Sequence, residues 1–250
     1  MSTMASSPNR RRRASAPGQR GAALLLLLAI AGVGAASVLI SALKGGSSDL
    51  RHQRQTLQAL AEAREALAGY AASHGRLPRP AASALDGQES AQPCDSEARC
   101  TGFLPWTSLG LPQGDGWSKL LRYSVTPMLT DEHVNLALAL GSKTVQQRDN
   151  RGQLNYLIGQ DVCDLSAPCA ALVVYSSGRY NLGTSVAGVA QANTVTGNID
   201  EQANEAASNH FVLRGLDDNP DLPGGPFDDM LGWIALKPIV QRMAIAPASP

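Results

Sequence analysis

The longest apolar stretch of the chain lies near its N-terminus, where residues 22–43 contain no charged side chain. A helix of about 20 apolar residues spans the hydrocarbon core of a bilayer. Residues 1–20 carry five arginines and no acidic residue, and positive charge of this kind stays on the cytoplasmic side. The pattern therefore predicts a helix that crosses a membrane once, with everything after it on the far side.

A second helix is predicted shortly after the apolar stretch. Residues 44–48 read Lys-Gly-Gly-Ser-Ser, and because glycine weakens a helix, they predict a flexible joint. Over residues 49–73 apolar side chains recur at near-helical spacing between charged ones, which indicates an amphipathic helix. Gly75 and Pro78 then stop it.

Short apolar runs in the second half of the chain indicate strands. Residues 120–125, 134–140 and 170–176 favour strands by their length and composition. Residues 154–158 give a weaker signal that fits a helix or a strand. Residues 230–242 could form a closing strand or helix, and Pro238 within them argues against one long regular element.

The four cysteines fall into two local pairs, Cys94 with Cys100 and Cys163 with Cys169. Four cysteines allow three disulfide connectivities, and the spacing alone does not choose among them. An exported chain meets an oxidising compartment, which favours two small local disulfide loops. A structural zinc site is the alternative, and the spacing fits it poorly because zinc ligands usually lie two to four residues apart.

Composition limits the function classes. The formal net charge of zero includes the five arginines near the N-terminus, so the remainder is mildly acidic and a nucleic-acid-binding face is not expected. Aromatic residues make up 4 % of the chain, against 24 glycines and 15 prolines. This composition favours a loop-rich fold over a dense enzyme core.

Catalytic motifs are incomplete. Residues 183–187 approach the nucleophile elbow Gly-x-Ser-x-Gly around Ser185, but Ala187 stands at the fifth position. The four histidines are scattered, and none belongs to a His-Glu-x-x-His motif. We therefore expect that the protein is not an enzyme.

The junction between the basic leader and the apolar stretch resembles that of a type IV prepilin. Gln19-Arg20-Gly21 is followed by Ala22-Ala23 and a run of leucines. The resemblance implies cleavage between Gly21 and Ala22. The family usually has glutamate at the fifth mature position, where this chain has Leu26, and certain minor subunits located at the filament tip lack this glutamate. A plain signal anchor and a cleaved signal peptide are the alternatives.

Segments further along the chain are similar to a group of pseudopilin-like proteins related to type II secretion pseudopilins. The similar segments are Gly75-Arg76-Leu77-Pro78, Gly102-Phe103-Leu104-Pro105-Trp106, Asp115-Gly116-Trp117, Tyr175-Ser176-Ser177-Gly178, Asp200-Glu201-Gln202-Ala203-Asn204 and Phe227 to Trp233. Two departures occur, since Ser118 replaces a usual glycine and Tyr180 intrudes between Arg179 and Asn181.

This resemblance implies an α+β fold: a long N-terminal helix, with a membrane half and an amphipathic half, packed on a small antiparallel sheet with disulfide-pinned loops. The expected divisions are a leader (1–21), a transmembrane and assembly helix (22–43), a joint (44–48), an amphipathic helix (49–73) and a periplasmic ectodomain (74–250).

The implied function is that of a minor pilin or pseudopilin, a structural subunit at the tip or in the initiation of a type IV pilus or a type II secretion pseudopilus. The implied partners are other pilin subunits, the prepilin peptidase and the inner membrane, with no nucleic acid. The implied localisation is the bacterial inner membrane, single-pass, with a periplasmic C-terminal domain. A signal-anchored periplasmic binding protein is the alternative function, followed by an anchored hydrolase.

One metal site follows from the resemblance, although no cofactor is otherwise expected. Major pseudopilins hold calcium in a C-terminal loop, and calcium takes about 6–8 oxygen ligands. The corresponding residues here are Asp200, Glu201, Asn204 and Asp228, with Asp229 as an alternative to Asp228. Loop residues of these types also serve simply to satisfy their own turns.

Overall fold

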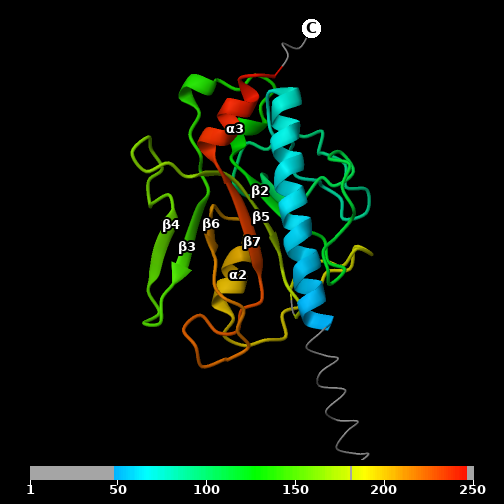
Figure 1. Cartoon of the computed structure of the whole chain (residues 1–250), viewed down its shortest axis with the longest axis vertical. Helices are drawn as coiled ribbons and strands as arrows, with labels where there is room; N and C mark the ends of the chain where they lie inside the picture. Colours follow the sequence, from blue (N-terminus) through cyan, green and yellow to red (C-terminus); the bar gives the residue numbers. More distant parts are fainter. Residues whose placement is uncertain (1–47, 181, 247–250) are drawn as a thin grey trace, which may run out of the picture. The chain divides into compact units, whose positions relative to one another are not determined.

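The computed structural model of the chain describes residues 48–180 and 182–246. A helix over residues 48–74, hereafter the long helix, lies along one face of a four-stranded sheet (Figure 1). Its buried side chains include Leu60, Ala63, Leu67 and Ala71, whose three- and four-residue spacing places them on one side of the helix. The pattern of apolar positions predicted a helix at 49–73.

The four-stranded sheet is antiparallel throughout. It contains β1 (Thr101–Phe103), β2 (Arg122–Val125), β5 (Ala170–Ser176) and β7 (Met230–Ala235) in the spatial order β1-β2-β5-β7. All seven residues of β5 are buried. A strand buried on both faces needs a layer on each side of its sheet.

The second layer is a three-stranded mixed sheet. It contains β3 (Thr144–Arg148), β4 (Leu154–Ile158) and β6 (His210–Val212) in the order β4-β3-β6. β4 pairs with β3 antiparallel and β6 pairs with β3 parallel.

The two faces of β5 contribute to separate cores. Leu172 and Val174 belong to the core that includes Leu67 of the long helix. Val173 and Tyr175 belong to a smaller core with residues of the second sheet. The alternation of β5 side chains between its two faces therefore holds the layers together.

Short helices complete the structure. α2 (Ile199–Glu205) contacts β6, and α3 (Leu236–Met243) follows β7 directly. Pro238 lies in the first turn of α3, where a missing N–H costs nothing because that group has no intrahelical acceptor. Two 3₁₀ helices, Pro127–Thr130 and Leu136–Leu138, lie between β2 and β3.

The predicted strand at 134–140 is wrong. The Asn135 side chain accepts a hydrogen bond from the Ala137 N–H at 3.2 Å and caps a 3₁₀ turn instead. Leu138 and Leu140 are exposed, and Ala139 between them is buried, so the apolar run that suggested a strand is buried only in part. The expectation of disulfides is confirmed, and the bonds join Cys94 to Cys100 and Cys163 to Cys169.

The predicted fold class needs two corrections. The single small antiparallel sheet is replaced by two sheets, because β3 and β6 pair in parallel across a long separation that no local pattern reveals. Within the described residues, no helix combines the length and apolar character needed to cross a membrane. This finding contradicts the predicted membrane half of the N-terminal helix and the predicted single-pass inner-membrane localisation. Residues 22–43 and the junction of Gly21 and Ala22 lie outside the described residues.

Candidate functional site

Three buried carboxylates meet at the end of the four-stranded sheet. Glu201 comes from α2, and Asp228 and Asp229 immediately precede β7. One oxygen from each of the three lies within 4.8 Å of the others, and all three residues are buried. We call these residues the acidic triad.

Hydrogen bonds from the chain itself occupy most of the triad's oxygens. Glu201 Oε1 accepts from the Asp228 backbone N–H at 2.8 Å, and Glu201 Oε2 accepts from Asn198 Nδ2 at 2.7 Å. Asp229 Oδ2 accepts from Asn204 Nδ2 at 2.8 Å. Asp228 Oδ2 accepts from the Tyr180 N–H at 2.6 Å, whereas Asp228 Oδ1 is buried and has no hydrogen-bond partner.

The loop after β5 approaches the triad closely. Gly178 has φ of 58°, and a Cβ at this position would lie 2.2 Å from the Asp228 carbonyl oxygen. Both the left-handed backbone and the lack of space favour glycine here. The Ser176-Ser177-Gly178 segment of the sequence is therefore placed beside the acids.

A buried lysine lies near the same loop. Lys119 donates from Nζ to the carbonyl oxygens of Ser177 at 3.1 Å and Tyr180 at 2.6 Å. Burial lowers the pKa of Lys119, and the charge of Asp228 opposes that shift. The lysine thus provides one positive charge close to several carboxylates.

Burial raises the pKa values of two of the three acids in the triad. Burial, followed by the charge of Glu201, raises the pKa of Asp228 from its ordinary value of 3.8 to about 7. Burial also raises the pKa of Asp229 well above its ordinary value, and the hydrogen bond from Asn204 opposes this shift. The triad therefore retains a proton in a pH range where exposed carboxylates are ionised.

The predicted calcium ligands do not all come together. Asp200 points to two arginines instead, with Arg148 Nη2 at 2.6 Å and Arg214 Nη1 at 2.9 Å. Asn204 uses its amide oxygen to accept from the Val212 N–H at 2.7 Å. Glu201 and Asp228 do lie together, and the third acid beside them is Asp229.

One feature of the acidic triad favours a bound divalent cation. Calcium binds carboxylate oxygens, and the unpartnered Asp228 Oδ1 is an acceptor that the protein leaves unsatisfied. The adjacent Asp-Asp pair before Trp233 was the available sequence signal for Asp229. Nothing local in the sequence indicates that Asp200 pairs with arginines from β3 and from the residues after β6.

Ser185, the serine of the incomplete nucleophile motif, lies in a tight turn. Its Oγ accepts a hydrogen bond from the Val189 N–H at 3.2 Å. This contact stabilises the turn, which is the ordinary role of serine in such a position.

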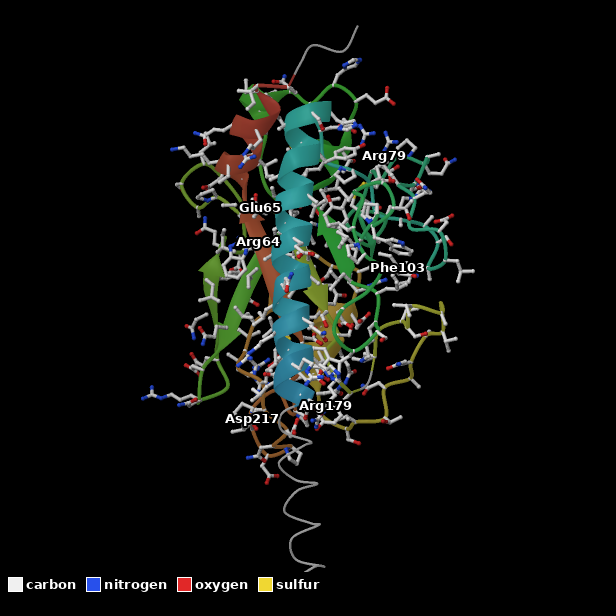
Figure 2. All side chains as sticks on the ribbon, turned by 45° about the vertical axis from the view of Figure 1, so that its right-hand side comes forward. Arg64, Glu65, Arg79, Phe103, Arg179 and Asp217 are labelled. Carbon is white, nitrogen blue, oxygen red and sulfur yellow. A yellow bond between two sulfur atoms is a disulfide. The ribbon has the colours of Figure 1, made fainter. Side chains whose placement is uncertain are left out.

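The side of the long helix next to β7 and α3 carries charged side chains. Figure 2 shows Arg64 and Glu65 on this helix. They line a groove of about 390 Å³ together with Trp233, Pro238 and Arg242 from β7 and α3.

No family model, curated protein or solved structure matches the chain.

Proposed function

We propose that the protein is a minor pilin or pseudopilin, a structural subunit at the tip or in the initiation of a type IV pilus or a type II secretion pseudopilus. The observation that carries the proposal is the long helix packed on an antiparallel sheet, downstream of a prepilin-like leader. Leu60, Ala63 and Leu67 fix the inner face of this helix to the sheet. The outer face remains available to neighbouring subunits.

The outer face suits contact with other helices. Leu50 and Leu57 lie two helical turns apart, and their exposed fractions are 55 % and 57 %. Residues seven apart in a helix lie on the same side. These leucines are supporting evidence for pilin-type partners that pack along the helix.

The chain lacks the acid that most subunits of such filaments carry near the mature N-terminus, because Leu26 occupies the position. A subunit without this acid does not offer a buried charge to a neighbour. We therefore assign it to the tip or to initiation, with the prepilin peptidase as its processing partner.

Processing of the leader tests this proposal. In cells with a prepilin peptidase, the mature chain is expected to begin at Ala22, as read by mass spectrometry of its N-terminal peptide. The Gly21→Val variant is expected to remain uncut, whereas the matched Gly18→Val variant in the same leader is processed normally. A mature chain that begins elsewhere, or that begins at Ala22 when the peptidase gene is deleted, contradicts the proposal.

We also propose that calcium binds at the acidic triad and fixes the loop after β5. The supporting observation is the buried, unpartnered Asp228 Oδ1. Because a ligand of the folded state stabilises it, calcium in excess is expected to raise the melting temperature by about 5 °C relative to chelator. The Asp228→Asn variant should lose this response, and Asp221→Asn, in an exposed loop, should keep it. An equal rise in both variants would argue against the site.

A further inference from the structure

β4 is an edge strand of the three-stranded sheet. It pairs with β3 on one side, and within the described residues no other strand or backbone hydrogen bond lies on its other side. In Figure 1 β4 lies at the left border of the sheet. Alternate residues of such a strand direct their N–H and C=O groups away from the sheet, where a further strand can form hydrogen bonds with them.

The composition of β4 does not protect this edge. Its sequence is Leu-Asn-Tyr-Leu-Ile, without charge or proline. Natural proteins usually protect an edge with lysine, proline or a cover of other chain segments. Leu154 and Leu157 are instead exposed, at 39 % and 45 %.

Exposed apolar side chains gather in the sequence around β4. Of the large apolar residues exposed in the described part of the chain, six fall within residues 138–165: Leu138, Leu140, Leu154, Leu157, Val162 and Leu165. Leu165, in the loop closed by Cys163 and Cys169, is 86 % exposed. Exposed apolar side chains on and next to an unprotected edge strand favour contact with another chain.

The charges that flank β4 indicate which partner fits. Arg151 lies three residues before the strand and Asp161 three residues after it. In an antiparallel pairing of β4 with a second β4, centred on Tyr156, each Arg151 lies opposite the partner's Asp161. Among the described residues, the Arg151 guanidinium forms no ion pair or hydrogen bond, and its backbone N–H donates to Asp149. The Asp161 carboxylate accepts a hydrogen bond from the Tyr156 hydroxyl of its own chain and keeps its second oxygen for the partner's Arg151. The edge is thus complementary in charge to itself.

We propose that two copies of this chain associate through antiparallel pairing of their β4 strands about a two-fold axis at Tyr156. The pairing places Leu154 opposite the partner's Ile158 and Tyr156 opposite the partner's Tyr156. Cross-strand pairs of aromatic and apolar residues stabilise such a contact. Because each patch contacts its own copy, the association closes at two chains.

A bulge limits the length of this pairing. The β3–β4 register shifts between Val145 and Gln146, which leaves Leu157 as the extra residue of β4. Bulges shorten the regular part of an edge. The contact is therefore short, and the exposed leucines and the two charge pairs supplement it. The proposed association of two copies does not depend on the proposed function in pili or pseudopili.

Cysteine cross-linking of the full chain tests the register. All four native cysteines are paired in disulfides, so an introduced cysteine is the single free thiol. Tyr156→Cys places two thiols on the two-fold axis, where the Cα separation of paired strands permits a disulfide. We expect mild oxidation to give roughly tenfold more covalent dimer from Tyr156→Cys than from the matched Asn155→Cys, whose two copies are offset along the strands. The readout is a non-reducing gel.

Charge reversal provides the second arm of the test. Adding Arg151→Glu to Tyr156→Cys is expected to reduce the dimer roughly tenfold, since two attractive pairs become repulsive. Adding Asp161→Arg to these two substitutions is expected to restore the yield of covalent dimer, because the pairs are again of opposite charge. Equal cross-linking at positions 155 and 156 would show association through another part of the chain and overturn the proposal. Absence of a Tyr156→Cys dimer, in a variant with an unchanged melting temperature, would overturn it too.

Discussion

Replacement of Leu67 by alanine is expected to lower the free energy of unfolding by about 3 kcal/mol. Leu67 is fully buried on the inner face of the long helix and belongs to the core shared with β5. Removal of its side chain leaves a cavity between the helix and the sheet, because close-packed neighbours relax only partly. Chemical denaturation monitored by circular dichroism measures the change.

Leu57 provides a matched control on the same helix. Its side chain is 57 % exposed, and Leu57→Ala preserves helix propensity, so the expected change is within about 0.5 kcal/mol. If Leu67→Ala were as mild as Leu57→Ala, the long helix would not be packed on the sheet as described. The helix–sheet contact, on which the proposed function rests, would then be wrong.

Replacement of Asp228 by asparagine is expected to stabilise the protein by about 2 kcal/mol at about pH 8. The pKa of Asp228 is about 7 in the folded protein and 3.8 ordinarily. Between these values the folded state binds more protons than the unfolded state, so this group reduces stability as pH rises from about 4 to about 7. The reduction is complete above that window and absent below it.

The difference between variant and wild type should follow the same window. Chemical denaturation in the presence of a chelator measures the unfolding free energies of the variant and of the wild type. They should be almost equal near pH 4 and show the full difference at about pH 8. An amide retains the acceptor for the Tyr180 N–H and removes the charge that faces Glu201. Asp221→Asn, in an exposed loop, is the control and should leave the profile unchanged. A destabilising effect of Asp228→Asn at high pH would show that the triad is not strained by burial.

Local patterns predicted the elements that depend on local physics. The amphipathic period identified the long helix, and the continuous apolar run at 170–176 matches β5. The same run could have indicated a layer on each face of its sheet. The predicted fold contained one small antiparallel sheet, and the second sheet was missed.

Long-range contacts account for what could not be predicted. The parallel pairing of β3 with β6 and the contact of Asp200 with Arg148 and Arg214 both join segments far apart in the sequence. Asp200 and Glu201 are adjacent on α2, yet one binds arginines and the other joins the acidic triad. Successive helix residues point about 100° apart, so neighbours in a motif need not share a site.

The parallel pairing of β3 with β6 has a consequence for the order of synthesis. The β3–β4 hairpin emerges from the ribosome before β6, which is made only after β5 and α2. Until then the hairpin has two open edges, because its parallel partner does not yet exist. Pairing between distant segments is slow, and unpaired strands are prone to join other chains in the meantime. The nascent protein therefore passes through a stage at which both edges of this hairpin are open to other chains.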